Sequence, residues 1–154
     1  MKRIKINEKY CMACRLCEIN CIVAHSKSKK ILKAFKEELP RALARVKVFE
    51  KGAVSFALQC RHCDQDKKTG REAPCIEACL TGAMKRNEKT GEVEHNSDKC
   101  IGCWMCIMSC PYGVIIADKR ERKVATKCDL CPDEEVPACV QACINEALTL
   151  EEDE

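Results

Sequence analysis

Sixteen of the 154 residues are cysteine, and they form four groups of four along the chain. The first and third groups share the spacing C-x2-C-x2-C-x3-C: Cys11, Cys14, Cys17 and Cys21, then Cys100, Cys103, Cys106 and Cys110. The second and fourth groups keep the C-x2-C start and the C-x3-C end, but eleven and seven residues separate their second and third cysteines. They are Cys60, Cys63, Cys75 and Cys79, then Cys128, Cys131, Cys139 and Cys143. Thiolates at this spacing bind [4Fe–4S] clusters, three cysteines of a group on one cluster and the fourth on its neighbour. The sequence therefore predicts sixteen ligands for four [4Fe–4S] clusters.

Two other uses of clustered cysteine compete with this interpretation. Disulfides suit a secreted chain, but the segment MKRIKINEKYC has no apolar stretch of the kind a signal peptide needs. We therefore expect a cytoplasmic location, where thiols stay reduced. Structural zinc also uses paired C-x2-C units, so a multi-zinc protein is the alternative from a different class. Four zinc sites would not require the C-x2-C-x2-C-x3-C group twice, and this favours iron and sulfide.

The composition indicates a core that depends on its metal. Aromatic residues make up 4% of the chain and charged residues 33%, which indicates a small hydrophobic core. We therefore expect the clusters to stabilise the fold and the apo-chain to be largely unfolded. The formal charge of +3 counts every cysteine as neutral. Each oxidised cluster with its thiolates adds about −2, which brings the loaded protein to about −5 and argues against a nucleic-acid partner. No apolar run is long enough for a membrane span, and no nucleotide-binding glycine motif or catalytic Ser/His/Asp set is present.

Short elements must hold the cysteine groups. Period-2 patterning predicts a strand at 3–7 that pairs with 147–150, which would bring the first and fourth groups together. Apolar residues at helical spacing predict a helix over 29–39, ended by Pro40. The segments 45–49 and 54–58 predict a hairpin around Lys51-Gly52.

The second half of the chain is also predicted to consist of short elements. Residues 83–95 predict two short polar strands around Lys89-Thr90-Gly91, and 114–117 with 123–126 flank a charged turn at 119–122. The residues before two of the fourth cysteines, 76–78 and 140–142, predict short helical turns. The acidic tail 151–154 is expected to be frayed.

Residues other than cysteine give weaker signals. Small residues inside the groups would let backbone approach a cluster, or are ordinary turn residues: Ala13, Gly102, Ala78 and Ala142. His62 is expected to lie at the surface or beside a ligand, with cluster tuning as the alternative. We expect His25 and His95 to be solvated, and Trp104 and Tyr112 to shield a cluster. The lysines from Lys27 to Lys36 are a candidate docking patch for an acidic partner, with a solvated face as the alternative.

Three inner segments carry a family resemblance: QCRHCDQ (59–65), PCIEACLTGAM (74–84) and CIGCWMCIMSCPYG (100–113). The chain resembles the four-cluster ferredoxin-like subunits of dimethyl sulfoxide reductase, formate dehydrogenase and formate hydrogenlyase systems. The compact length, with CRLCEINC, VSFALQCRHC and KCDLCP, is most similar to the CooF-type electron-transfer proteins that accompany anaerobic CO dehydrogenase. The resemblance covers essentially the whole chain. The middle of the second group, 64–74, is longer than usual and adds a polar loop with Lys67-Lys68, a second candidate docking patch.

The resemblance implies an α+β fold of two ferredoxin-like dicluster modules with short helices and β-hairpins. Residues 1–57 plus 111–154 would form the outer module, with groups one and four, and residues 58–110 the inner module. It also implies crossed ligand sets, namely Cys11, Cys14, Cys17 with Cys143; Cys128, Cys131, Cys139 with Cys21; Cys60, Cys63, Cys75 with Cys110; and Cys100, Cys103, Cys106 with Cys79.

The same resemblance implies a carrier with no reaction of its own. It would relay single electrons from a CO dehydrogenase to a hydrogenase or a flavin-containing NAD(P) oxidoreductase. The alternative implied by the wider family is the iron–sulfur subunit of a molybdenum or tungsten oxidoreductase such as formate dehydrogenase.

Overall fold

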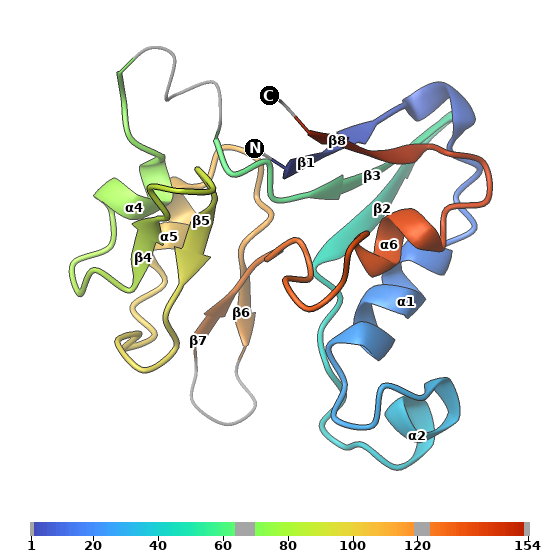
Figure 1. Ribbon diagram of the computed structural model, residues 1–154, viewed down its shortest axis with the longest axis horizontal. Helices are drawn as coiled ribbons and strands as arrows, with labels where there is room; N and C mark the ends of the chain where they lie inside the picture. Colours follow the sequence, from blue (N-terminus) through green and yellow to red (C-terminus); the bar gives the residue numbers. More distant parts are fainter. Residues whose placement is uncertain (1, 64–69, 119–123, 153–154) are drawn as a thin grey trace. The chain divides into compact units, whose positions relative to one another are not determined.

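The computed structural model describes residues 2–63, 70–118 and 124–152, and it divides the chain into two compact units (Figure 1). Unit 1 comprises Met1–Arg3, Cys60–Asp129 and Glu152–Glu154, and unit 2 comprises Ile4–Gln59 and Leu130–Glu151. The return to unit 2 thus falls after residue 129, whereas the expected modules divide at residue 110.

Unit 2 holds the first cysteine group between short helices and one hairpin. Its elements are η1 (Glu8–Tyr10), α1 (Leu16–Ala24), α2 (Ile31–Lys36), β2 (Val46–Lys51), β3 (Val54–Gln59) and α6 (Ala138–Gln141). Strands β2 and β3 pair antiparallel from Val46↔Gln59 to Lys51↔Val54, as predicted. The tight turn between them uses Gly52 at φ +61°, a conformation that glycine adopts without steric cost.

The hairpin is tied to the first cysteine group by two side chains. The hydroxyl of Ser55 donates to the carbonyl oxygen of Cys11 at 2.6 Å. The Glu18 carboxylate accepts the Val48 backbone N–H at 2.6 Å. Hydrogen bonds between segments far apart in the sequence fix the position of the loop that carries the cysteines.

The first and last strands pair as the sequence predicted. Strand β1 (Lys2–Ile6) lies beside β8 (Leu148–Glu152) in a two-stranded sheet. The Asn7 backbone N–H donates to the Ala147 carbonyl at 2.8 Å. The prediction of a frayed tail was wrong for Glu151 and Glu152, because β8 includes both and Glu151 pairs with Lys5 at 2.7 Å. Residues 153–154 lie outside the described part of the chain.

Helix α2 is shorter than the sequence predicted. It ends at Lys36 rather than near Leu39. The only buried residue of the helix is Ala34, while Ile31 and Leu32 are exposed. The carboxylate of Glu38 accepts the backbone N–H groups of Lys27 and Ser28. Because that carboxylate closes the loop before the helix, the chain turns back before another helical turn can form.

Unit 1 holds the second and third groups in a small mixed core. Its elements are α4 (Pro74–Glu77), β4 (Met84–Arg86), β5 (Val93–His95), α5 (Met105–Ser109), β6 (Ile116–Asp118) and β7 (Val124–Thr126). Strands β4 and β5 pair antiparallel, as do β6 and β7. The turn predicted at 119–122 lies outside the described residues, as do 64–69.

Cysteines form part of this core. Met84 and Val93, on strands predicted to be polar, are each only 2% exposed, and they pack in one cluster with Cys75 and Cys106. A core that includes clustered cysteines fits the expectation of a fold held together by a cofactor. Short helices and two-stranded antiparallel sheets make this an α+β fold of the ferredoxin-like dicluster kind. A search of the helices in the described ranges found none with the length and hydropathy of a membrane span.

Candidate iron–sulfur sites

Each cysteine loop contains two residues in the left-handed backbone region. Groups one and three place them two and four positions after the first cysteine, and groups two and four place them two and three positions after it. The residues are Ala13 and Arg15, Gly102 and Trp104, His62 and Cys63, and Leu130 and Cys131. Left-handed residues in a loop turn successive backbone N–H groups toward one side, which makes a concave site for an anion such as an iron–sulfur cluster. The four groups are therefore a structural repeat of two types of loop.

The fourth cysteines follow a second repeated pattern. Helices α4 and α6 end just before Cys79 and Cys143, whose N–H groups donate to the carbonyls of Ile76 and Val140 at 3.1 Å. These short helices confirm the turns predicted at 76–78 and 140–142. Ala78 and Ala142 are the C-caps of the two helices.

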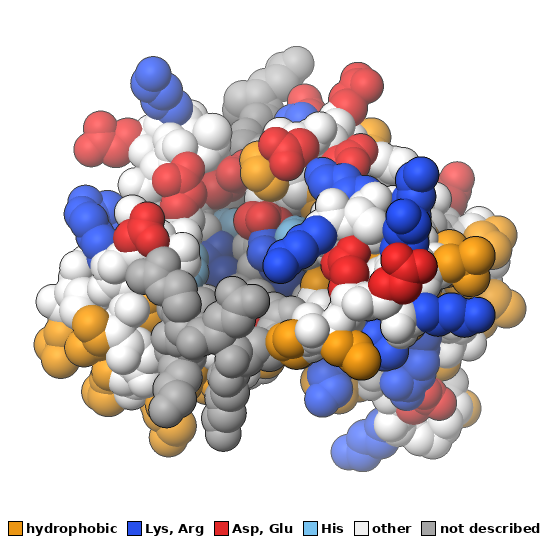
Figure 2. All heavy atoms as spheres, turned by 90° about the horizontal axis from the view of Figure 1, so that it is seen from below, with side chains coloured by type: hydrophobic (Ala, Val, Ile, Leu, Met, Phe, Trp, Pro, Cys, Tyr) orange, Lys and Arg blue, Asp and Glu red, His pale blue; other side chains and the backbone are white. Residues whose placement is uncertain are grey.

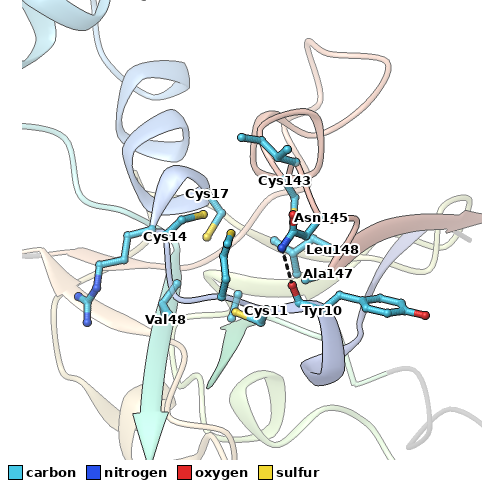
Figure 3. Close-up of a pocket in the computed structure, with 13 residues that line it drawn as sticks. Tyr10, Cys11, Cys14, Cys17, Val48, Cys143, Asn145, Ala147 and Leu148 are labelled. Atoms are coloured by element: carbon cyan, nitrogen blue, oxygen red, sulfur yellow. Dashed lines mark hydrogen bonds between the residues drawn. The ribbon is translucent and has the colours of Figure 1, made fainter. Parts of the chain in front are cut away.

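Four cysteines of unit 2 line one hollow, shown in Figure 3. Cys11, Cys14 and Cys17, from the loop leading into α1, point into the same space as Cys143, which follows α6. Burial, with smaller contributions from the charges of Glu18, Cys14 and Cys143, raises the pKa of the Cys17 thiol to about 11. The amide of Asn145 donates to the Tyr10 carbonyl at 3.2 Å and joins the two segments. We call these four cysteines the N-terminal quartet.

A second quartet, in unit 1, is open to solvent. Cys79, Cys100, Cys103 and Cys106 line a hollow together with Trp104. Cys103 is exposed, and so is the apolar side chain of Ile101, which lines the same hollow. Burial raises the pKa of the Cys106 thiol, and Cys100, Cys79 and Cys103 raise it further. We call this set the open quartet.

The fourth cysteine of the open quartet is held by backbone hydrogen bonds. The Met84 N–H donates to the Cys79 sulfur at 3.4 Å. Partial burial acts to raise the pKa of the Cys79 thiol, but hydrogen bonds from the backbone of Met84, the Thr81 side chain and other nearby N–H groups outweigh it, and the pKa is lowered. Backbone N–H groups therefore stabilise the thiolate at this position.

The third quartet, in unit 1, has one buried cysteine, Cys75, and three half-buried ones, Cys60, Cys63 and Cys110. Burial raises the pKa of the Cys75 thiol to about 12, and the neighbouring Cys60, Cys63 and Cys110 act in the same direction. Burial also raises the pKa of Cys60. Cys63 and Cys110 pack against the core cluster that contains Cys75. We call Cys60, Cys63, Cys75 and Cys110 the buried quartet.

The fourth cysteine group spans the boundary between the units. Cys128 is a buried member of unit 1, whereas Cys131 and the buried Cys139 and Cys21 belong to unit 2. Within unit 2, the Cys21 sulfur lies 3.7 Å from Nδ1 of His25, and the Cys131 sulfur lies within 4.8 Å of a ring nitrogen of His25. The Arg45 N–H also donates to the Cys21 sulfur at 3.2 Å.

The histidines only partly match expectation. His62 is 2% exposed, so of the two expected positions, at the surface or beside a ligand, the structure supports the second. Nδ1 of His62 accepts the Val93 N–H at 3.0 Å. Burial, with a smaller contribution from the charge of Lys127, lowers the pKa of His62 to about 3, so the imidazole is neutral at physiological pH. His25 and His95 are half-buried rather than solvated. The left-handed loop around Cys60 turns the His62 ring inward, which the sequence does not reveal.

The sequence reasoning also passed over Lys127. This side chain is 3% exposed, and its Nζ donates to the Cys128 carbonyl at 2.9 Å. The one available signal was its place directly before the first cysteine of the fourth group, in KCDLCP. A lysine is so rarely buried that composition and periodicity give no warning of it.

The donor sets fit iron–sulfur clusters. Each of the three quartets gathered within a unit consists of four thiols, the soft ligand that [4Fe–4S] clusters take. Their loops add converging backbone N–H groups, which structural zinc sites do not need.

The fold and the thiol sets define an iron–sulfur protein, and comparison with known proteins gives its family. The model of the 4Fe-4S dicluster domain matches residues 52–153. The chain belongs to this family.

Two relatives match most of the chain. An "Iron-sulfur protein" of Rhodospirillum rubrum is 36% identical over 162 residues, covering 96% of this chain and 80% of the relative. The "Electron transport protein HydN" of Escherichia coli strain K12 is 34% identical over 156 residues, covering 90% of this chain and 81% of the relative.

A solved structure shares the fold. A chain in the active-site complex BamBC of benzoyl coenzyme A reductase, with bound 1,5-dienoyl-CoA, aligns with a TM-score of 0.51 at 21% identity. The alignment covers 100% of this chain and 77% of that one. At this identity the likeness is one of fold.

Proposed function

We propose that the protein is an electron carrier that relays single electrons through four [4Fe–4S] clusters and has no reaction of its own. The observation that supports this most is the gathering of cysteines from distant parts of the chain into quartets of pure thiol, with left-handed loops beneath them. The relative named as an electron transport protein agrees with a carrier.

The proposed ligand sets are crossed between groups. The N-terminal quartet binds one cluster, the open quartet a second and the buried quartet a third. The fourth cluster takes Cys128, Cys131, Cys139 and Cys21. The first three sets are supported by the shared hollows and the thiol repulsions described above, and the last by the family resemblance and the neighbourhood of His25.

Electrons must enter and leave where a cluster comes near solvent. Cys14 and Cys103 are the two cysteines with exposed side chains, and each belongs to a quartet rimmed by apolar side chains. Met12, Tyr10 and Ile144 are exposed around the first, and Ile101 is exposed beside the second. Small, partly apolar surfaces of this kind suit transient redox encounters. We propose that these two quartets hold the clusters that exchange electrons with partners.

For the donor we propose an anaerobic CO dehydrogenase, and for the acceptor a hydrogenase or a flavin-containing NAD(P) oxidoreductase. The support is the sequence resemblance over the whole chain, including KCDLCP and CRLCEINC. The proposed location is the cytoplasm.

The test is co-purification of tagged, cluster-loaded protein from anaerobic extract, followed by reduction with each candidate donor. Recovery of CO dehydrogenase, and bleaching of the visible absorption by CO plus that enzyme, are the expected results. Recovery of a molybdenum or tungsten oxidoreductase with reduction by formate would replace the proposed donor. Protein that contains zinc without labile sulfide after anaerobic isolation would overturn the carrier function itself.

A further inference from the structure

The side chain of His62 is buried in unit 1, and both its backbone and its ring are held by hydrogen bonds. His62 is 2% exposed and lies between Cys60 and Cys63 in the left-handed region, at φ +54°. Its carbonyl oxygen accepts from the Arg86 guanidinium at 3.2 Å, and its ring nitrogen Nδ1 accepts the Val93 backbone N–H at 3.0 Å. One contact fixes the backbone and the other fixes the ring, so the side chain has a defined orientation.

Arg86 is itself anchored within unit 1. Its Nε donates to the Glu72 carboxylate at 2.8 Å. The same carboxylate accepts the Ala73 backbone N–H at 2.8 Å, directly before the helix that carries Cys75. The network therefore joins the loop around His62 to the segment that leads into Cys75.

The hydrogen bond from Val93 determines which ring nitrogen of His62 carries the proton. A backbone N–H is a donor, so Nδ1 is the acceptor and has no proton of its own. The proton of the neutral imidazole is then on Nε2, which makes Nε2 a donor. Nε2 is buried, and among the described residues no acceptor lies within hydrogen-bond reach of it. The Asp129 carboxylate, whose charge acts on the ring, does not accept from it either.

The surroundings of the ring indicate which acceptor this N–H group serves. A buried donor without a partner costs stability, and nearly all such groups in folded proteins are paired. Val93, whose N–H contacts the ring, packs in one core cluster with Cys75, and Cys63 and Cys110 pack against the same cluster. His62 thus lies beside Cys63 in the chain and contacts the core that holds other members of the buried quartet. That core also contains Cys106 of the open quartet, so the experiment must distinguish the two clusters.

We infer that Nε2 of His62 donates a hydrogen bond to a sulfur of the cluster held by Cys60, Cys63, Cys75 and Cys110. The inference rests on the proposed carrier function. Hydrogen bonds to the sulfurs of an iron–sulfur cluster help to set its reduction potential. Reduction adds negative charge to the cluster, and a hydrogen bond to a more negative acceptor is stronger. The bond therefore stabilises the reduced form more than the oxidised form, and His62 raises the potential of this cluster.

Two substitutions separate the roles of the two ring nitrogens. In His62→Asn, the amide oxygen takes the place of Nδ1 as acceptor for Val93, and nothing replaces the Nε2 donor. Asparagine also tolerates the left-handed backbone at this position. In His62→Gln, the longer side chain brings an amide N–H group near the place of Nε2, but the acceptor for Val93 is lost. The control is His95→Asn, which changes a half-buried histidine beside the open quartet.

The first measurement detects the histidine nitrogen at the cluster. The full chain is produced with isotopically labelled histidine nitrogens and loaded anaerobically, and its iron and sulfide are counted. Pulsed electron paramagnetic resonance is then recorded on partly reduced protein, in which the buried cluster is the one whose spectrum changes in Cys63→Ser. We expect this cluster to show coupling to a histidine nitrogen and to an exchangeable proton. Both couplings should disappear in His62→Asn and persist in His95→Asn.

The second measurement is the reduction potential of the same cluster. At fixed ambient potential, His62→Asn should lower its reduced-to-oxidised ratio about threefold to tenfold, where tenfold corresponds to about 59 mV for a one-electron couple. His62→Gln should change the ratio less than about twofold. A purely structural role predicts the reverse order, because His62→Gln loses the contact with Val93 and His62→Asn keeps it.

The outcomes that contradict the inference are distinguishable from failure of the carrier function. Fully loaded protein whose buried cluster shows no histidine coupling, or an exchangeable proton alone as from an internal water, would overturn the role of His62. Coupling that appears on the open cluster instead would do the same, and in each case the carrier function stands. An unsubstituted chain that holds zinc without labile sulfide would overturn both.

The assignment does not depend on one variant. The chain has three histidines, at positions 25, 62 and 95. If His62→Asn loses iron, a coupling that persists in both His25→Asn and His95→Asn belongs to His62 and supports the inference. A coupling that disappears in either of those two variants would overturn it.

Discussion

The buried and open quartets of unit 1 each contain four cysteines, but the thiolates of the two quartets are stabilised in different ways. The buried quartet (Cys60, Cys63, Cys75, Cys110) lies in the core, where burial raises the pKa of Cys75 to about 12 and the charge of Lys127 opposes that effect. The open quartet (Cys79, Cys100, Cys103, Cys106) reaches the surface, and hydrogen bonds from backbone N–H groups lower the pKa of Cys79.

The difference indicates which part of each site a mutation can reach. Compensation by one side chain can be removed by substitution, whereas compensation by backbone N–H groups persists as long as the loop keeps its shape. Both sites contribute cysteines to the hydrophobic core of unit 1, but the buried site has no exposed ligand, so we expect its ligands to carry more of the stability of unit 1. The open site contributes less to the fold and has the exposed sulfur that an electron partner needs.

The largest expected effect is on folding. Cys75→Ser removes a buried ligand and leaves a polar hydroxyl in the core, so we expect the apparent free energy of unfolding to fall by about 3 kcal/mol or more. Cys103→Ser removes an exposed ligand of the open quartet, and it should lower the apparent free energy of unfolding by clearly less. Thermal unfolding of the two loaded variants, followed by circular dichroism, makes the comparison. Equal losses in stability would show that the two sites are not different in this respect.

The next effect concerns which cluster each fourth cysteine serves. With crossed ligation, Cys110→Ser should damage the same cluster as Cys75→Ser, and Cys79→Ser the same cluster as Cys103→Ser. Paramagnetic resonance spectra of the four variants, reduced under identical conditions, are compared in pairs. Spectra that instead group Cys110 with Cys103 would show that each motif closes on its own cluster.

The organisation of these sites was predicted from the sequence to a large extent. Cysteine spacing indicated four thiol groups, and period-2 patterning placed β1 beside β8 and paired β2 with β3, because alternation and turn residues are local signals. The inward orientation of His62 and the burial of Lys127 could not be predicted in this way. Both depend on left-handed loop residues and on contacts between segments that are distant in the sequence. Composition and cysteine spacing carry no information on such contacts. Likewise, helix α2 ends early because of a hydrogen bond from outside the helix.

A smaller effect should appear in the rate of iron loss. A chelator reaches the open and N-terminal quartets through the exposed Cys103 and Cys14, whereas Cys60, Cys63, Cys75 and Cys110 include no exposed cysteine. We expect iron release from the oxidised protein to be biphasic, with the fast phase at least tenfold faster. Once the slow phase is complete, cooperative thermal unfolding should also disappear. A single phase of release, or a sharp transition in the iron-free chain, would contradict the account.

The smallest effect concerns docking through charge. Five exposed lysines lie on or near α2, at positions 27, 29, 30, 33 and 36, and Lys29 pairs with Asp133 at 3.9 Å. Figure 2 shows basic, acidic and hydrophobic side chains interspersed over one face of the molecule, rather than a field of one sign. Reversal of these lysines to glutamate should therefore slow electron delivery only about twofold to tenfold at low salt, with unchanged iron content. Unchanged transfer rates would identify the lysines as a solvated face. The second lysine pair, at 67–68, lies outside the described residues.

The most direct test of the central claim is the number of electrons that one chain accepts. Anaerobically loaded protein is assayed for iron and sulfide and then reduced by stepwise addition of a low-potential reductant, with the visible absorption followed to its end point. Sixteen thiolates arranged for four cubane clusters predict about 16 iron atoms and 16 sulfides per chain, and four electrons at the end point. Eight iron atoms with two electrons, or zinc with no electrons, would contradict it.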